Sequence, residues 1–285
     1  MGRHDDALEG LGPTGAHLEE LLELALAAAE SGAEVLRGRD AGRLGVTGKS
    51  GEGDWVTRFD VAAEQAVLRT ILDRRPHDTV TGEESGTHRP EHPSGIRWSV
   101  DPLDGTTNFI RNIVYYGTSV AAADEDGTWL AGVVHAPALS RIYWAARGSG
   151  AWLSDHGRVR RLTGPGADQG RLLGTGFSYD PATRAEQITE LGCLAEGFGD
   201  VRRLGSAALD LCMVADGTLD AYAERGLNEH DLAAGALIAE EAGAVVSRPA
   251  LTPMLDGGPS DAERLAAFTV AGSAAFVAAH AASRR

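Results

Sequence analysis

The sequence is poor in cysteine. Only Cys193 and Cys212 occur in 285 residues, and neither lies in a spacing typical of a metal-binding motif. Two thiols in a chain of this length indicate a reducing compartment, and we expect both to be buried in the core.

Long hydrophobic runs are also missing. The most apolar early stretch, LLELALAAAE, is short and interrupted by glutamates, and the N-terminal MGRHDDALEG is polar and acidic. The first is unsuited to spanning a membrane, and the second does not resemble a signal peptide. We therefore expect a cytoplasmic protein with no membrane partner.

An excess of basic residues is absent as well. The formal net charge is −15, whereas nucleic-acid-binding proteins usually carry a basic face, so we expect no nucleic-acid partner. The acidity has two interpretations. It is typical of a well-solvated surface, and it also suits carboxylates that hold cations which the formal charge does not count.

The chain does have enough apolar sequence for a large core. Hydrophobic residues make up 43% of it, which predicts one large domain or two of ordinary size. We expect residues 1–15 to be disordered, residues 16–160 to form an N-terminal α+β half, and residues 161–285 to form a C-terminal α/β half.

Periodicity predicts the order of the elements. Apolar residues at helical spacing predict a helix from His17 to Leu36, and a second helix opens at Asp60 and stops before Pro76. Short runs linked by Gly, Asp and Pro predict an antiparallel meander over Tyr116–Ala123, Trp129–His135, Arg141–Ala145 and Ala151–Ser154. After about Arg161, strands alternate with helices, which indicates layers of helix and sheet. The helices predicted there are Pro181–Ala195, Ser206–Ala215, Asp231–Ala242 and one at the C-terminus.

The stretch DPLDGTTN, residues 101–108, places two carboxylates three positions apart. Like charges ~4 Å apart repel by about 1 kcal/mol even in water, so such a cluster needs a reason. We expect Pro102 to fix a turn that presents Asp101, Asp104 and the Leu103 carbonyl to one point. Oxygen ligands without thiol or imidazole neighbours suit Mg²⁺.

The residues behind this pair add a second feature. Gly105 and Thr106 begin the next segment and predict free N–H groups, which make an anion seat beside the cations. Cations next to a phosphate seat describe metal-assisted hydrolysis of a phosphate ester. Taken alone, the stretch suits a well-capped loop equally well, but its combination with Glu83 and Asp231 favours the metal interpretation.

The chain resembles the inositol monophosphatase family, in the Mg²⁺-dependent, lithium-sensitive phosphatase superfamily. The resemblance covers about residues 17 to 280, and the motifs that carry it are GDWVTRFDVAAEQ with TGEES, WSVDPLDGTTNF, GSAALDL and EHDLAAGALIAEEAGA. It implies a layered αβαβα sandwich of the inositol monophosphatase and fructose-1,6-bisphosphatase type, in which the N-terminal half carries the metal-binding motifs and the C-terminal half completes the metal and substrate site.

The resemblance also implies roles for individual residues. The implied catalytic residues are Asp60, Thr106 and Glu83, of which Asp60 and Thr106 orient the attacking water. The implied metal ligands are Glu83, Asp101, Leu103, Asp104 and Asp231. The implied contacts to phosphate and substrate are Gly105, Thr106, Gly205, Ser206, Ala207, Glu224 and Asp231. Glu84 and Lys49 are implied neighbours of the metal site, and Asp60 is also interpreted independently as a helix N-cap.

The sequence departs from the family pattern at two places. The family usually has tryptophan before the last motif aspartate, where this chain has His230. We favour a packing or surface substitution there over the alternative that His230 lines the pocket and alters the leaving-group preference. The second departure, IRNIVYYGTS, places Tyr115 and Tyr116 either in the sheet core or at a subunit interface.

We therefore expect a phosphate monoesterase that uses two to three Mg²⁺ ions, accepts Mn²⁺ and is inhibited by Li⁺. Its expected reaction is direct attack by a metal-activated water, without a phospho-enzyme, on inositol 1-phosphate or a related cyclitol or sugar phosphate. The alternative substrates are histidinol phosphate, fructose 1,6-bisphosphate, a nucleoside 3′,5′-bisphosphate and a natural-product (nucleoside or aminocyclitol) phosphate. A non-catalytic binding protein on the same fold is a weaker alternative. The resemblance favours a homodimer.

Overall fold

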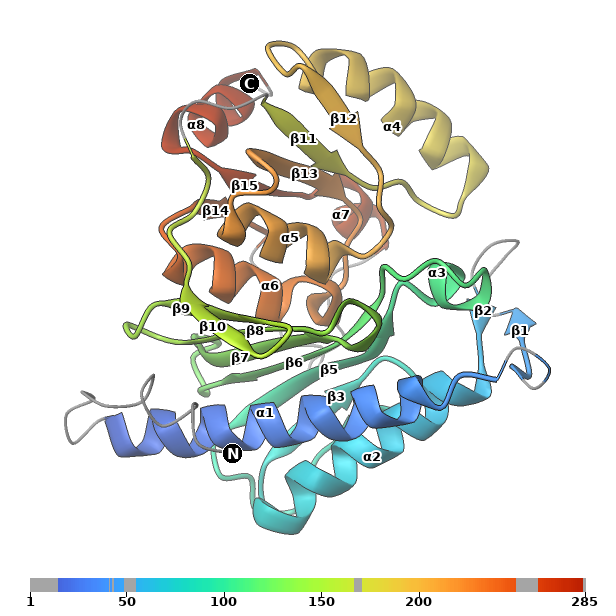
Figure 1. Cartoon of the computed structure of the whole chain (residues 1–285), viewed down its shortest axis with the longest axis vertical. Coiled ribbons are helices and arrows are strands. Elements are labelled where there is room, and N and C mark those ends of the chain that lie inside the picture. Colours follow the sequence, from blue (N-terminus) through green and yellow to red (C-terminus); the bar gives the residue numbers. More distant parts are fainter. Residues whose placement is uncertain are drawn as a thin grey trace.

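The computed structural model describes residues 15–40, 42, 44–48, 55–166, 171–249 and 261–283. The segment expected to be disordered, residues 1–15, lies outside this range except for Gly15, at which the first helix begins. The described chain is layered as helix, sheet, helix, sheet, helix, and the predicted αβαβα sandwich is confirmed (Figure 1).

The larger sheet has eight strands among the described residues. In spatial order they are β10 (Arg158–Arg161), β9 (Ala151–Asp155), β8 (Arg141–Ala146), β7 (Trp129–Ala136), β6 (Gly117–Ala123), β5 (Arg97–Asp104), β3 (Thr79–Gly82) and β4 (Gly86–His88). Neighbouring strands are antiparallel except β3 and β5, which confirms the predicted meander over β6 to β9. Because β3 and β5 run parallel, the residues at their carboxyl ends reach the same edge of the sheet.

Helices cover both faces of this sheet (Figure 1). On one face lie α1 (Gly15–Arg37) and α2 (Arg58–Arg74), and on the other lie α5 (Ala207–Asp216) and α6 (Glu229–Glu241). Leu21 and Ala25 of α1 pack with Val67 of α2 against Val120 and Val133 of the sheet. Apolar residues spaced by three and four lie on one side of a helix, which is why this pattern predicts where the helix docks.

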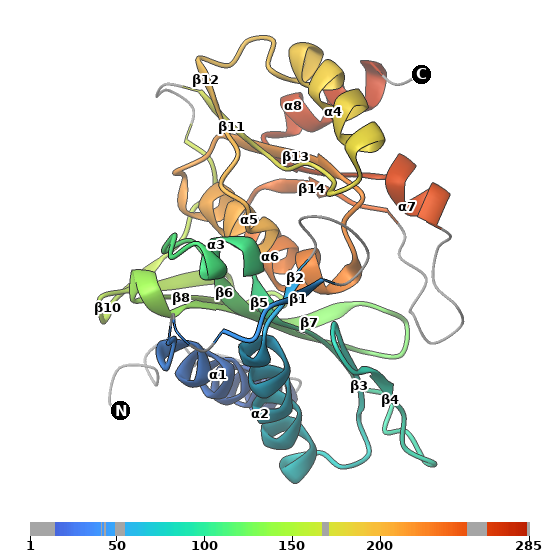
Figure 2. The same cartoon turned by 90° about the vertical axis from the view of Figure 1, so that its right-hand side faces the viewer.

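The smaller sheet has five strands in the part of the chain that the structure covers. Its spatial order is β12 (Asp200–Arg202), β11 (Leu172–Thr175), β13 (Ala221–Arg225), β15 (Phe268–Gly272) and β14 (Val245–Ser247). Tyr222 packs toward α5 and α6, while its neighbours Ala221 and Ala223 join the cluster on the opposite face. That outer face carries α4 (Pro181–Leu194) and α8 (Ala274–Ser283) (Figure 2).

Shorter elements join these layers. They are β1 (Thr47–Gly48), β2 (Trp55–Val56), α3 (Thr106–Ile110), the 3-10 helix Pro137–Leu139 and α7 (Asp261–Ala266). The first sheet ends at Arg161 and the second begins at Leu172, so the boundary expected between residues 160 and 161 lies one residue before the end of the first sheet. The division into two halves stays a prediction. Among the helices described, none has both the length and the apolar character needed to cross a bilayer.

Two helices begin earlier than predicted. Thr57 is the N-cap of α2 and Asp60 is its third residue, so the interpretation of Asp60 as the N-cap is wrong. Likewise α6 begins at Glu229, and Asp231 is its third residue. In both cases the aspartate accepts a hydrogen bond from the backbone N–H of the N-cap residue, the arrangement of a capping box. The sequence pattern had located the aspartate but not its position in the cap.

Two local predictions also need correction. Asp101 to Asp104 lie inside β5 and not in a separate turn, although the pairing register with β6 shifts between these two aspartates. Pro102 has no N–H to contribute to the ladder, which accounts for the irregularity. Cys212 is buried as expected, but Cys193 on α4 is exposed. Tyr115 and Tyr116 are both buried, each 7% exposed, in agreement with a core position.

Candidate active site

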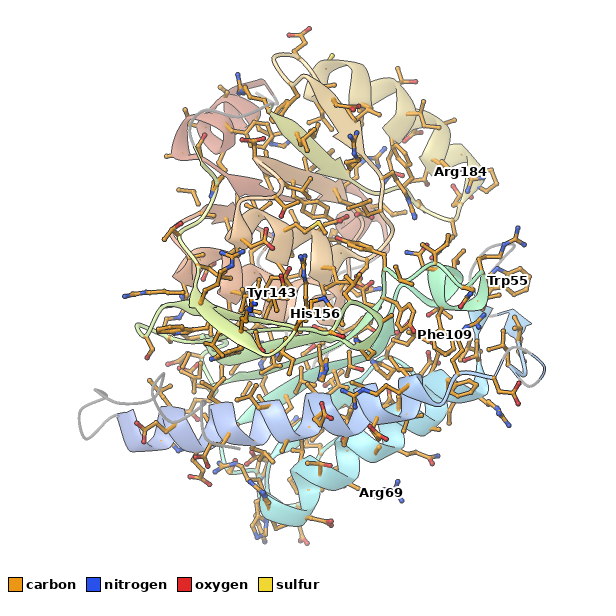
Figure 3. The ribbon with its side chains drawn as sticks, in the orientation of Figure 1. Trp55, Arg69, Phe109, Tyr143, His156 and Arg184 are labelled. Atoms are coloured by element: carbon orange, nitrogen blue, oxygen red, sulfur yellow. The ribbon has the colours of Figure 1, made fainter. Side chains whose placement is uncertain are left out.

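A cavity of about 570 Å³ is lined by residues of both sheets and of the helices between them. The sequence-predicted site residues that line it are Glu83, Asp101, Leu103, Asp104, Gly105, Thr106, Gly205, Ser206, Ala207, Glu224 and Asp231. Trp55, labelled in Figure 3, enters from β2. Residues far apart in sequence therefore meet in one cavity, as the motif analysis requires.

Thr106 and Asp60 form a hydrogen-bonded pair. The Thr106 hydroxyl lies 3.0 Å from Oδ1 of Asp60 and 3.0 Å from the carbonyl oxygen of Leu103. Oδ2 of Asp60 accepts hydrogen bonds from the N–H and the hydroxyl of Thr57, at 2.8 and 2.6 Å. Asp60 is fully buried, and this burial raises its pKa despite the three donors. The carboxylate is thus both immobilised and made more basic.

Aromatic packing holds the two helices that carry this pair. Phe109 of α3, labelled in Figure 3, lies with its ring centroid 5.3 Å from that of Phe59 on α2. On its other side Phe109 contacts Tyr116 edge to face at 5.0 Å. These contacts place the first turn of α3 against the first turn of α2, where Thr106 and Asp60 meet.

The two aspartates of β5 are crowded and buried. Burial raises the pKa of Asp101 well above its usual range, and Glu83 and Asp104 raise it further. Burial and the nearby Asp231 raise the pKa of Asp104 to about 8, although hydrogen bonds to Asp104 oppose the shift. Burial first, and the neighbouring carboxylates second, thus disfavour the charged forms of both aspartates, and a bound cation would favour these charged forms.

Donors from the start of α5 fix Asp104 in place. Its Oδ2 accepts hydrogen bonds from the Ser206 hydroxyl at 2.6 Å and from the Ala208 N–H at 2.8 Å. Gly205, just before this helix, has a φ of +94°, which side chains with a Cβ rarely adopt. A Gly205 to Ala208 segment that wraps around a buried carboxylate explains why the chain has small residues there.

Glu83 follows β3 directly, and its N–H donates to the Val100 carbonyl on β5 at 3.2 Å. Glu84 and Ser85, the next two residues, are held by Glu64 of α2. The Glu64 carboxylate accepts hydrogen bonds from their backbone N–H groups at 2.8 and 2.7 Å. Glu64 itself is 2% exposed. Glu84 is therefore placed beside the cavity by its backbone, and it is not among the residues that line the cavity.

Glu224 lies at the part of the cavity that belongs to the smaller sheet. Burial raises its pKa to about 7, and a hydrogen bond from the Tyr222 hydroxyl opposes that shift. A Cβ added to Gly176, which directly follows β11, would collide with the Glu224 carboxylate, so a larger residue there would force that side chain to move. Arg203, which also lines the cavity, is the nearby positive charge that lowers the pKa of Glu224.

His230 is buried and lines the cavity, on the residue before Asp231. Its Nε2 lies 3.7 Å from Oδ1 of Asp231, longer than a hydrogen bond. Its Nδ1 is buried and has no hydrogen-bond partner within the described structure. Glu83, Asp101 and His230 each offer one ligand atom, and these three atoms lie within 4.8 Å of one another.

These residues fit a divalent cation. The predicted ligands at this edge are carboxylates and one carbonyl oxygen, the hard donors that Mg²⁺ prefers. Burial and the neighbouring carboxylates raise the pKa values of Asp101 and Asp104. A bound cation would stabilise the charged forms of both aspartates. The structure adds a donor that the sequence analysis left out, the imidazole of His230.

Some supporting residues carry no motif signal. Glu64 lies one helical turn after Asp60, a spacing that puts both on one side of α2 and was available from the sequence. The buried pair of Arg97 and Glu229, joined by two 2.8 Å hydrogen bonds, was not predictable because 132 residues separate its members. Lys49, expected near the metal site, lies outside the described residues.

Comparisons with known proteins agree with this geometry. The inositol monophosphatase family model matches residues 17–279. The inositol-1-monophosphatase of Mycobacterium leprae is 44% identical over 225 residues, which cover 76% of this chain and 77% of that protein. The Nus factor SuhB of Salmonella typhimurium is 40% identical over 200 residues, 70% of this chain and 73% of that protein. The crystal structure of the extragenic suppressor protein suhB from Bartonella henselae matches with a TM-score of 0.76 at 31% identity, over 90% of this chain and 94% of that one.

Proposed function

Because the chain belongs to the inositol monophosphatase family and is a phosphoric monoester hydrolase, we propose that it hydrolyses inositol 1-phosphate or a related cyclitol or sugar phosphate with the help of Mg²⁺. The observation that carries the proposal is that the Thr106–Asp60 pair adjoins the cavity that Asp101 and Asp104 line. A proton acceptor and a cation site are the two parts that phosphate ester hydrolysis by water requires.

The Thr106–Asp60 pair handles the proton in this proposal. The single hydroxyl proton of Thr106 donates to either Asp60 or the Leu103 carbonyl, which leaves the hydroxyl oxygen free to accept from a water. Thr106 lines the cavity, so it orients that water, and the proton passes through the hydroxyl to Oδ1 of Asp60. The raised pKa of Asp60 makes it a better acceptor than an exposed carboxylate.

The ligands that we propose for the cations are Glu83, Asp101, Leu103, Asp104 and Asp231. When bound, Mg²⁺ supplies charge neutralisation of the phosphate and lowers the pKa of a water molecule. We propose two to three ions per site, with Mn²⁺ as a substitute and Li⁺ as an inhibitor. Gly105 and Thr106, which line the cavity beside Asp104, contact the phosphate in this proposal.

The leaving group faces Glu224 and Arg203. A carboxylate beside a guanidinium suits a leaving group that carries hydroxyls, because a hydroxyl can donate to the carboxylate and accept from the guanidinium. This favours a cyclitol or sugar. Histidinol phosphate, fructose 1,6-bisphosphate, a nucleoside 3′,5′-bisphosphate and a natural-product (nucleoside or aminocyclitol) phosphate remain the alternatives. The relative from Mycobacterium leprae is named an inositol-1-monophosphatase.

A regulatory role is the second candidate, because a relative at 40% identity is named Nus factor SuhB. All of the side chains proposed for the reaction are present: Asp60, Thr106, Glu83, Asp101, Asp104 and Asp231. This complete set favours a catalytic protein over a non-catalytic one.

For assembly we propose a homodimer in the cytoplasm. Ile113 and Val114, 50% and 55% exposed, offer an apolar contact surface next to α3. Light scattering on the purified protein tests this assembly.

A panel of phosphomonoesters with Mg²⁺ tests the proposed reaction. It contains inositol 1-phosphate, a hexose monophosphate, the four alternative substrates and phenyl phosphate, and the readout is released inorganic phosphate. We expect inositol 1-phosphate or the hexose monophosphate to give the highest kcat/KM. Release from none of them, by protein shown to be folded, would contradict the proposal, and preference for another member would correct the substrate.

A further inference from the structure

His230 occupies a position that packing alone does not explain. It is the second residue of α6, it is 7% exposed, and it lines the cavity. Its buried Nδ1 has no partner among the residues that the structure describes. A buried polar nitrogen without a hydrogen bond is unfavourable, so such an atom in a functional cavity calls for a ligand.

The other buried histidine among the described residues, His135, provides the comparison. In His135, Nδ1 lies 3.0 Å from Oε2 of Glu30, and Nε2 lies 3.3 Å from Nη2 of Arg37. Both ring nitrogens are therefore satisfied by protein groups, as expected of a histidine with a structural role. His230 differs, because its Nε2 is 3.7 Å from Asp231 and its Nδ1 has no partner in the described chain.

The atoms around His230 are those of a cation site. A ring nitrogen of His230 and one oxygen each from Glu83 and Asp101 lie within 4.8 Å of one another. Two ligand atoms that are each about 2.0–2.2 Å from one ion lie at most about 4.4 Å apart, so side-chain shifts of a few tenths of an ångström bring even atoms 4.8 Å apart onto a common ion. Asp101 lies in β5 and Glu83 directly follows the parallel neighbour β3, while His230 lies in the first turn of α6.

The backbone that carries His230 is also held from outside the cavity. The hydroxyl of Ser119 on β6 donates to the His230 carbonyl at 3.4 Å. The preceding residue, Glu229, is joined to Arg97 by two hydrogen bonds of 2.8 Å, and both side chains are buried. These contacts fix the start of α6, so His230 is placed before any cation arrives.

We propose that His230 is a nitrogen ligand of the cation held by Glu83 and Asp101, and that it shifts the preference of this centre from Mg²⁺ toward Mn²⁺ or Zn²⁺. The proposal rests on the proposed function only in placing a cation in this cavity. Mg²⁺ favours oxygen ligands alone, whereas imidazole suits the transition metals. A mixed site with two carboxylates and one imidazole therefore changes relative affinities without a new fold.

Pulsed electron paramagnetic resonance of the Mn²⁺-loaded protein tests the ligand directly. A coordinated imidazole gives a nitrogen coupling to Mn²⁺, and the coupling pattern changes from ¹⁴N to ¹⁵N when the protein is grown with ¹⁵N-histidine. We expect this coupling in the unmodified protein, its loss in His230→Phe, and its retention in His156→Gln. His156 is the control because it lies in the β9–β10 turn, labelled in Figure 3, with its side chain 75% exposed.

Competition binding measures the metal preference. We expect the affinity for Mn²⁺ relative to Mg²⁺ to fall about tenfold or more in His230→Phe, the size of effect that perturbing a metal site produces. No histidine nitrogen coupling in the Mn²⁺-loaded protein would overturn the proposal, as would failure to bind Mn²⁺ or a coupling that persists in His230→Phe. The ¹⁵N measurement shows without a variant whether a histidine coordinates Mn²⁺, and loss of the histidine coupling in a second variant, His230→Gln, assigns the ligand if His230→Phe fails to fold.

The outcome separates this proposal from the proposed function. A nitrogen coupling in protein that hydrolyses none of the phosphomonoesters supports the His230 ligand and contradicts the phosphatase proposal. Hydrolysis with Mg²⁺ in protein that shows no nitrogen coupling supports the phosphatase proposal and contradicts the ligand. Neither readout depends on the other.

Discussion

The hydroxyl of Thr106 lies 3.0 Å from Oδ1 of Asp60, across 46 residues of sequence. Each residue stands in the first turn of its helix, and the contact between Phe59 and Phe109 brings the two helix starts together. The pair is buried at its base and open to the cavity at Thr106. Structural packing thus sets the distance on which the proposed proton transfer depends.

Removal of the Thr106 hydroxyl should abolish most of the activity. We expect Thr106→Ala to lower kcat about 10²–10⁴-fold, the contribution that a positioned acid–base group usually makes. Thr106→Ser keeps the hydroxyl and should retain activity within about tenfold of the unmodified protein. Steady-state phosphate release measures both. Equal losses in the two variants would contradict the role of the hydroxyl.

Metal binding should stabilise the protein, and Asp104 should be needed for this effect. Burial and Asp231 raise the pKa of Asp104 to about 8, so a bound cation relieves an unfavourable charge. Ligand at 100 times its Kd stabilises the native state by about 2.7 kcal/mol, which raises the Tm by several degrees. We expect Mg²⁺ to raise the Tm and EDTA to reverse the rise.

Asp104→Asn is the matched variant for that experiment. Its amide oxygen can still accept from Ser206 and Ala208, so the fold should survive, but it no longer offers a carboxylate to the cation. We expect turnover to be lost and the Mg²⁺-dependent rise in Tm to disappear. Retained activity, or an undiminished rise in Tm, would show that Asp104 does not bind the metal.

The sequence predicted the fold for a physical reason, and most of the residues predicted for the site line one cavity. The parallel pairing of β3 and β5 places the residues after two predicted strands at one edge of the sheet. Glu83 and Asp101 therefore had to meet once the two strands were neighbours. The antiparallel meander followed in the same way from short turns between strands.

The supporting contacts were beyond the sequence because they join residues that no local pattern links. Arg97 and Glu229 stand at the start of a strand and of a helix 132 residues apart. Cap positions were also misplaced, since Asp60 and Asp231 as third residues of capping boxes give the same local signal as N-cap residues. From the sequence, His230 was interpreted as a packing or surface substitution. Only the three-dimensional structure shows that its buried Nδ1 has no hydrogen-bond partner among the described residues.

The ion pair of Arg97 and Glu229 should be important for stability. Both side chains are buried, and Arg97 also stacks over the Trp129 ring at 4.6 Å. Glu229→Gln leaves a buried guanidinium without its counter-charge, and we expect a loss of about 3–5 kcal/mol in the free energy of unfolding. Chemical denaturation measures it.

A more exposed pair serves as the control. Asp155 lies 3.3 Å from Arg141, with side chains 35% and 28% exposed, and Asp155→Asn should change stability by no more than about 1 kcal/mol. Similar losses in the two variants would show that burial of the Arg97 pair is not the cause. Replacement of both partners by Met and Leu should recover most of the loss, because no charge is then left unpaired.

Glu224 should affect substrate preference more than chemistry. It lines the cavity from β13, with the positive charge of Arg203 nearby. We expect Glu224→Gln to lower kcat/KM for inositol 1-phosphate by about 10- to 100-fold, the value of a hydrogen bond to a charged group. Phenyl phosphate has no hydroxyls on its leaving group, so its kcat/KM should stay nearly unchanged. Equal losses for both substrates would contradict this assignment.

The buried His135 should make stability depend on pH between about 4 and 6.5. Arg37 can only donate, so Nε2 of His135 must accept, and the ring is neutral with its proton on Nδ1 toward Glu30. Burial lowers the pKa of His135 from 6.5 to about 4, more than Glu30 raises it. In this pH range the unfolded chain therefore binds a proton that the folded protein does not bind. The free energy of unfolding decreases as the pH falls through this range.

The expected loss is about 2 kcal/mol between pH 7 and pH 5, measured by urea unfolding. His135→Gln does not titrate, and its amide can face both Arg37 and Glu30, so this variant should lose much less. Burial acts to raise the pKa of Glu30, but its charged neighbours outweigh burial and lower it below 4.5. Protonation of Glu30 therefore removes stability only below the pH range measured. An equal loss of stability in the unmodified protein and in His135→Gln would show that the titration of groups other than His135 causes the loss.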